Sequence, residues 1–185
     1  MSKALLVRSI VAVLGLVAAL PAAASDLGWH GLEVRGGALF PSDYDSGLTF
    51  ALAADLGELT DGLRLLAGIT YSEADDTETV RVQGLPFEVD SEISSIAVGA
   101  EVRWFPSRGE EGFFLGAGPY FHTQDSEDVL VVGNLTVRSD VEDEEIGIQG
   151  VLGYSFARRF DVQVRYDTVS NLEGVQLMVG LRFGK

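Results

Sequence analysis

Period-two alternation of apolar and polar residues is the feature that most constrains the fold of this chain. Residues 92–106, "EISSIAVGAEVRWFP", separate into two alternating sets. The apolar set is Ile96, Val98, Ala100, Val102 and Trp104. The more polar set is Ser95, Ala97, Gly99, Glu101 and Arg103. Successive side chains of a β-strand point to opposite faces, so this stretch predicts a strand with one apolar face and one polar face.

Seven further segments alternate in the same way, and no useful helical periodicity occurs after residue 25. These segments are residues 29–40, 48–56, 63–71, 113–122, 146–156, 160–167 and 175–183. Pro119 lies inside one of them, where a proline is expected to cause a bulge or a missing ladder bond. The pattern predicts an all-β domain of eight strands.

The N-terminal 24 residues have a different pattern. Lys3 and Arg8 precede an apolar run over residues 10–20 that is too short to span a bilayer as a helix, and Pro21 and three alanines follow. This pattern is typical of a signal peptide, which predicts Sec-type export and a mature domain of residues 25–185. The chain has no cysteine, so disulfides, thiolate metal sites and a lipoprotein anchor are excluded.

The connections between the predicted strands differ strongly in length. Turns such as 57–62 and 106–112 are short, whereas 73–92 and 125–145 are long and each contains its own hairpin signal. An even number of strands with short turns at one end and long loops at the other indicates an outer-membrane barrel. We therefore expect an antiparallel up-and-down transmembrane β-barrel with two long extracellular β-ribbons.

Aromatic residues decide which face of the barrel is inside. In an up-and-down path they fall at two levels separated by aliphatic residues, which is the pattern of two interfacial girdles around an apolar band. Eight residues separate Phe113 from Phe121, about 26 Å along a strand and about 20 Å after tilting. The predicted girdle residues are Phe40, Phe50, Tyr71, Phe121 and Tyr166 at the long-loop end, and Trp104, Phe113, Tyr154, Phe156, Phe160 and Phe183 at the short-turn end.

The polar face must then point into the lumen, where charges have to be paired. We expect a charge network of Glu33, Arg35, Asp55, Arg64, Glu101, Arg103, Arg165 and Arg182. Arg64, together with residues across the barrel, is the expected partner of Glu101. A sealed interior is favoured over a narrow porin-like channel because eight strands enclose little space.

In these features the chain resembles the small eight-stranded outer-membrane β-barrels of Gram-negative bacteria, such as the membrane domain of outer membrane protein A and the opacity-type adhesins. The stretches that carry the resemblance are "FFLGAGPYF" and the last strand, "VQLMVGLRF". The last strand is similar to the C-terminal signal read by the barrel-assembly machinery, although Gly184 and Lys185 follow the terminal aromatic. The resemblance implies an outer-membrane location and contact with lipid and lipopolysaccharide.

Acidic residues are concentrated at the long-loop end. The full chain has a net charge of −15, and 19 of its 28 acids fall in the four connections at that end, including Asp125, Glu127, Asp140 and Asp167. Nucleic-acid binding is excluded for lack of a basic face. The acids suit either simple solvation, divalent cations bridging to lipopolysaccharide, or a basic partner, and no stretch fits an EF-hand calcium loop.

Catalysis has one candidate residue. His122, near Thr123, Asp125 and Ser126, is the only histidine expected at the long-loop rim. A lipid A-modifying enzyme would need a nucleophile and a base there in hydrogen-bonding geometry. We expect a monomeric, non-enzymatic structural or surface-interaction protein with no cofactor; a narrow channel is the second hypothesis and a lipid A-modifying enzyme the third.

Overall fold

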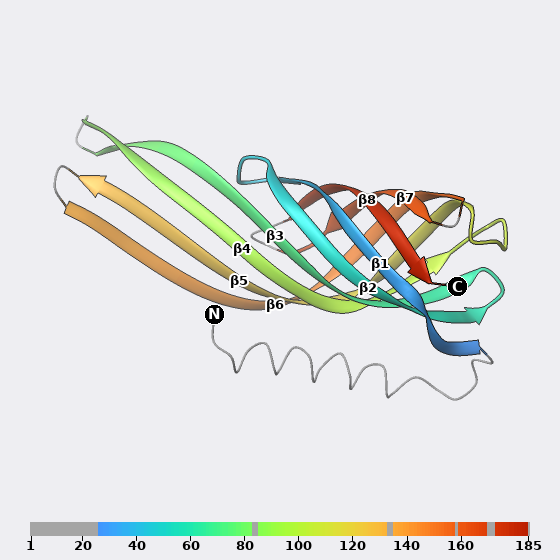
Figure 1. Ribbon diagram of the computed structural model, residues 1–185. Helices are drawn as coiled ribbons and strands as arrows, with labels where there is room; N and C mark the ends of the chain where they lie inside the picture. Colours follow the sequence, from blue (N-terminus) through green and yellow to red (C-terminus); the bar gives the residue numbers. More distant parts are fainter. Residues whose placement is uncertain (1–25, 83–84, 133–134, 158, 170–172, 185) are drawn as a thin grey trace.

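The computed structural model describes residues 26–82, 85–132, 135–157, 159–169 and 173–184. It is a closed antiparallel barrel in which every strand pairs with the next and β8 pairs with β1 (Figure 1). The strands are β1 Asp26–Pro41, β2 Gly47–Thr60, β3 Leu63–Val82, β4 Leu85–Trp104, β5 Gly112–Val132, β6 Leu135–Phe156, β7 Phe160–Asp167 and β8 Gly174–Gly184. The predicted eight-stranded up-and-down barrel is confirmed, while the predicted signal peptide, residues 1–24, lies outside the described residues.

The sequence alternation becomes an alternation of burial. Along β7, residues change strictly between exposed and buried, with Val162 and Val164 outside and Gln163 and Arg165 inside. The hydrogen-bond register places the inward-facing residues of neighbouring strands on the same face of the sheet. A slip of one residue would turn every side chain of a strand to the other face. The polar set of the sequence therefore lines the interior of the barrel, and the apolar set forms most of its exterior.

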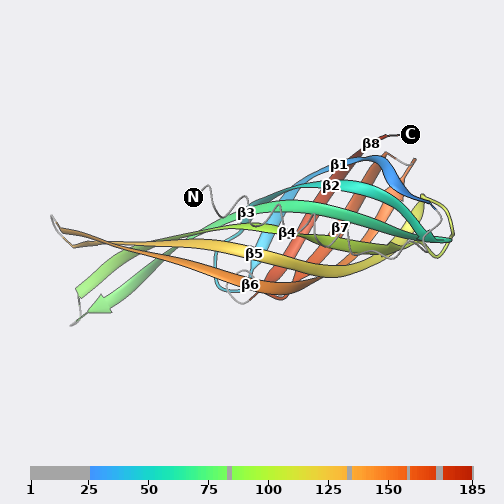
Figure 2. The ribbon, with the colours of Figure 1, turned by 90° about the horizontal axis from the view of Figure 1, so that it is seen from below.

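Four strands continue beyond the barrel as one sheet. β3 pairs with β4 as far as Val82 and Leu85, and β5 pairs with β6 as far as Val132 and Leu135. The two hairpins are joined because β4 also pairs with β5 up to Val89 and Leu130. Figure 2 shows these strands running well past the ends of β1, β2, β7 and β8, so we call them the protruding sheet.

Both outer strands of the protruding sheet lose a neighbour above the barrel. Pairing of β2 with β3 ends at Leu48 and Glu73, and pairing of β6 with β7 ends at Gln149 and Asp167. Where β6 leaves β7, the Thr168 hydroxyl lies 3.0 Å from the Ile148 nitrogen and 3.2 Å from its carbonyl oxygen. Beyond this point no strand of the described residues pairs with the outer side of β6, which we call its open edge.

Pro119 interrupts one hydrogen-bond ladder without shifting the register. β4 and β5 pair at Gly99 and Tyr120 and again at Val102 and Ala117, and the pairs between them are missing. The cause is that proline has no N–H to donate. Of the two expected outcomes, the missing ladder bond is found and the bulge is not.

The barrel exterior carries a broad band of exposed apolar side chains. Leu152, Leu177 and Val179 are about half exposed although they lie in the middle of their strands. Leu65 and Val98 are outward-facing exceptions on β3 and β4 and are largely covered. Among the described residues, no helix is long and apolar enough to span a membrane.

Candidate functional site: the charged lumen and the acidic sheet

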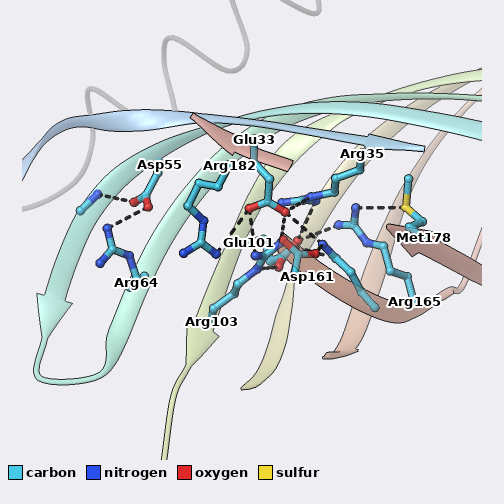
Figure 3. A network of polar contacts seen from close by, with 12 residues as sticks. Glu33, Arg35, Asp55, Arg64, Glu101, Arg103, Asp161, Arg165, Met178 and Arg182 are labelled. Atoms are coloured by element: carbon cyan, nitrogen blue, oxygen red, sulfur yellow. Dashed lines mark hydrogen bonds and ion pairs between the residues drawn. The ribbon is translucent and has the colours of Figure 1, made fainter. Parts of the chain in front are cut away.

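Two carboxylates, Glu33 on β1 and Glu101 on β4, form the centre of the barrel interior. Glu33 lies 3.0 Å from Arg103 Nη1 and also pairs with Arg35 on its own strand. Glu101 lies 2.6 Å from Arg165 Nη2, 2.5 Å from Arg103 Nε and 3.6 Å from Arg35 Nη1. We call these five residues the central cluster; Figure 3 shows their side chains converging from different strands.

Two glutamines and a further carboxylate surround the central cluster. Gln163 donates to Glu33 at 3.0 Å and also bonds Asp161, and Arg165 donates to the Gln149 side-chain oxygen. These contacts meet part of the remaining hydrogen-bonding capacity of the buried charges, which lowers the cost of burying them. Arg35 Nη2 and Arg165 Nε have no hydrogen-bond partner among the described residues. Asp161, Gln149 and Gln163 were missing from the predicted network, although their places in the alternation put them on the inward face.

An aromatic layer closes the side of the central cluster that faces the short turns. The Phe114 ring lies 4.6 Å from the Arg103 guanidinium carbon, and Phe105 packs 5.3 Å from Phe114. Gly153 makes room for this layer, because a Cβ there would lie 2.3 Å from the Phe114 ring. On the other side, Tyr120 lies 5.9 Å from the Arg165 guanidinium carbon.

A second ion-pair group lies closer to the short turns. Arg64 is 2.8 Å from Asp55 and 2.6 Å from Glu110, with Glu58 at 3.6 Å. The expectation that Arg64 pairs with Glu101 is therefore wrong. On adjacent strands Arg64 lies opposite Arg103, whereas Glu101 lies opposite Leu66, and the neighbouring acids at the barrel mouth take up the Arg64 charge.

Arg182 is the least well paired of the predicted lumen arginines. Its Nη2 lies 3.8 Å from Glu33, at the limit of an ion pair. All eight predicted lumen residues have ion pairs, but the structure places them in two groups: one around Glu33 and Glu101, and one around Arg64 and Asp55.

His122 does not lie at an open rim. Its side chain is buried in the lumen with Nε2 3.4 Å from Asp167 Oδ1, beside a cavity of only about 10 Å³. The assignment of Asp167 to the exposed loop acids is wrong, because this residue ends β7 and is only 3% exposed. Such a small space offers no room for a lipid substrate.

The predicted girdle residues occupy two levels of the exterior. At the long-hairpin end Phe50 lies directly opposite Tyr71, and at the short-turn end Phe113 packs against Tyr154 at 4.8 Å. Phe121 is half-buried, and the other ten are exposed: Phe40, Phe50, Tyr71, Trp104, Phe113, Tyr154, Phe156, Phe160, Tyr166 and Phe183. Aromatic rings at these two levels suit the interfaces of a bilayer.

Carboxylates also gather on the protruding sheet, where few of them are paired with a described arginine. A groove of about 480 Å³ on β4, β5 and β6, which we call the acidic groove, is lined by Glu92, Ser94, Asp125, Ser126, Glu127, Asp140, Val141 and Glu142. The one ion pair of these acids with a described arginine joins Glu127 to Arg138 at 3.2 Å, with both side chains exposed. Among the described residues no group of three or more histidine, aspartate or glutamate side chains is placed to hold a metal ion.

Comparisons with solved structures identify the fold. No protein-family model matches the chain, and a search of curated proteins finds no match. The Yersinia pestis outer membrane protein Ail in a bilayer nanodisc is 12% identical and superposes with a TM-score of 0.51 over 84% of this chain and all of Ail. A major outer membrane protein of Thermus thermophilus is 15% identical, with a TM-score of 0.50 over 84% of this chain and all of that one.

The crystal structure of Ail in complex with the heparin analogue sucrose octasulfate also matches, at 10% identity and a TM-score of 0.50, over 83% of this chain and 99% of Ail. These proteins share with this chain the closed antiparallel barrel, which in this chain has an apolar band outside and paired charges within. The chain therefore has the fold of the small eight-stranded outer-membrane β-barrels.

Proposed function

We propose that this outer-membrane barrel is a non-enzymatic surface protein, in which a closed barrel holds the protruding sheet outside the cell to bind a basic partner. The acidic groove is the observation that carries the proposal. Its carboxylates Glu92, Asp125, Asp140 and Glu142 have no ion pair with a described basic side chain. Unpaired carboxylates side by side repel one another and attract a cationic surface.

The open edge of β6 supports an extended peptide as that partner. Beyond Ile148, the strand has backbone groups on one side that β7 does not pair with. A peptide can add to such an edge through main-chain hydrogen bonds. Charged residues on the same strand, among them Asp140 and Glu142, disfavour edge-to-edge pairing of two copies, because both edges would be acidic.

The charge of this surface favours a different ligand from the one bound by Ail. Ail was crystallised with a sulfated heparin analogue, which is a polyanion. In this chain the predicted outer connections, without the buried Asp167, contain 18 acids and two arginines, Arg81 and Arg138. The same fold therefore supports recognition of a polycation here.

A closed lumen fits the proposal better than a channel. Glu33, Arg103, Glu101 and Arg165 are at most 1% exposed and interlock across the barrel. A pore would require several short charge-assisted contacts to open at once. We expect refolded protein in planar bilayers to give no steady conductance, and regular openings would instead support the channel hypothesis.

The long hairpins indicate which end of the barrel faces the outside of the cell. Protease added to intact cells should cut within residues 73–92 or 125–145 and leave residues 106–112 intact. Cleavage at Arg108 in intact cells would reverse the proposed orientation.

The binding experiment uses a fluorescent oligolysine peptide and protein in nanodiscs. We expect saturable, salt-sensitive binding that weakens about tenfold or more when Asp125, Asp140 and Glu142 are changed together to their amides. A matched control changes Glu110 and Glu111, acids at the short-turn end, to glutamine. Equal loss in both variants, or preferential binding of sucrose octasulfate, would contradict the proposal.

A further inference from the structure

We propose that the short-turn mouth of the barrel contains a binding pocket for a small soluble oxyanion of the phosphate type. This site is separate from the acidic groove and does not depend on the function proposed for it. A cavity of about 270 Å³ lies between the ends of β1, β2, β3 and β8 and the turns that precede β5 and β7. We call it the mouth pocket; its charged walls are Asp55, Arg64, Glu110, Arg159 and Arg182.

Two of its arginines, Arg159 and Arg182, have few partners within the protein. Arg182 reaches only Glu33, at 3.8 Å, and its Nε and Nη1 atoms are buried without a hydrogen-bond partner in the described part of the chain. Arg159 is exposed, and within the same described ranges it forms no ion pair. Since a buried guanidinium N–H without a partner is costly, these donors favour an acceptor from outside the protein.

The backbone holds these two arginines next to each other. The Arg182 nitrogen donates to the Arg159 carbonyl oxygen at 2.8 Å, and the Arg159 nitrogen donates to Phe156 at 3.1 Å. Both side chains line the mouth pocket, so their charges add at one place. Guanidinium groups suit oxyanions because their planar donors match two oxygens at once.

The acids of the mouth pocket are already occupied. Asp55 accepts from Arg64 at 2.8 Å and from the Gly57 nitrogen at 3.0 Å, and Glu110 accepts from Arg64 at 2.6 Å. On the Arg64 side of the mouth pocket the acids outnumber the single arginine, since Glu58 also lies 3.6 Å from Arg64. On the other side Arg159 and Arg182 have only the 3.8 Å contact of Arg182 with Glu33 among the described residues. An anion is attracted to that second side.

The position of the mouth pocket selects a soluble anion over a lipid headgroup. Its walls include the lumen-facing residues Asp55, Arg64 and Arg182, which are separated from lipid by the barrel wall. Ala157 and Arg159 in the same walls are exposed, so solvent reaches the mouth pocket from the short-turn end. A volume of about 270 Å³ suits a ligand smaller than typical drug-sized ones.

The test is titration of the refolded barrel in detergent with inorganic phosphate at constant ionic strength, followed by calorimetry and by amide chemical shifts. We expect saturable binding with shifts at Arg159, Arg182 and Gly184 and none on the protruding sheet. Arg182→Gln and Arg159→Gln should each weaken binding about tenfold or more, because each removes a charge-assisted contact. Arg138→Gln, the matched control on the protruding sheet, should leave binding unchanged.

Arg159→Gln keeps the test decisive if Arg182→Gln folds poorly, because Arg159 is exposed and outside the central cluster. Wild-type affinity in Arg159→Gln, an equal loss in Arg138→Gln, or no saturable binding by the wild-type protein would each overturn the proposal.

Discussion

The barrel interior and the protruding sheet are both rich in carboxylates, but the carboxylates of the interior are paired with arginines and most of those on the sheet are not. Inside the barrel, Glu33, Glu101 and Asp55 each lie within 3.0 Å of an arginine nitrogen. On the protruding sheet, Asp125 and Asp140 face other acids across the acidic groove, and the exposed pair of Glu127 with Arg138 is 3.2 Å long.

Solvent explains this difference. A carboxylate in the lumen has lost its hydration, so the sequence must supply a cation and further donors for it. A carboxylate on the protruding sheet keeps its water, so it needs no intramolecular partner and remains available to an external one. Charge in the barrel stabilises the fold, and charge on the sheet is available for recognition.

Glu101→Gln should have the largest effect on stability. It keeps the shape of the side chain but leaves Arg165 and Arg103 without a carboxylate they contact at 2.6 and 2.5 Å. Breaking a buried ion pair from one side costs about 3–5 kcal/mol. Urea unfolding of the refolded protein in lipid would measure this change in the free energy of unfolding. A loss below about 1 kcal/mol would show that water hydrates the central cluster.

Leu152→Arg tests the exterior of the barrel. We expect it to lower the free energy of unfolding somewhat less than Glu101→Gln does. Leu152 lies outward on β6, between Leu115 and Val164, and is 51% exposed. An arginine facing the bilayer midplane costs about 2–4 kcal/mol. The same urea unfolding in lipid should show this loss for Leu152→Arg and a clearly smaller one for Leu152→Ala; equal losses would mean that this face does not meet hydrocarbon.

Gly153→Val tests the aromatic layer beneath the central cluster. Its added side chain would collide with the Phe114 ring, which lies over Arg103. Overpacking of this kind costs about 1–3 kcal/mol. Thermal unfolding would detect it, and the neighbouring outward change Leu152→Val should cost less, since lipid accommodates the changed shape. A neutral Gly153→Val would show that Phe114 can move aside.

Alternation alone predicted much of the barrel. Seven of the eight strands contain their predicted segment whole, and β4 contains the fourth segment, 92–106, as far as Trp104. Residues such as Glu101 and Arg165 face inward as their parity requires. The reason is that strand geometry is local, with a side-chain period of two residues. Lipid outside and paired charges inside then constrain the composition of the two faces.

Contacts across the lumen could not be predicted in the same way. Glu101 and Arg165 are 64 residues apart, and their contact depends on the tilt and stagger of the whole barrel. The pairing of Arg64 with Glu110 depends on the conformation of the turn between β4 and β5, which brings Glu110 to the barrel mouth. Asp167 was counted among the outer acids although the predicted segment 160–167 already made it the last inward-facing residue of a strand, because it is also the first residue of the connection that follows.

Glu127→Gln should have the smallest effect, and it completes the comparison with Glu101→Gln. It removes the partner of Arg138 on the protruding sheet, where the two side chains are 43% and 68% exposed. An exposed ion pair contributes about 0–1 kcal/mol and is screened by salt, while removing one acid from the acidic groove also relieves repulsion. We therefore expect urea unfolding in lipid to shift by less than about 0.5 kcal/mol at low salt and by nothing measurable at high salt. The loss in Glu101→Gln should persist at both salt concentrations, because the central cluster is closed to ions. If the two variants respond equally to salt, the lumen is open to solvent, and the distinction between structural charge and available charge fails.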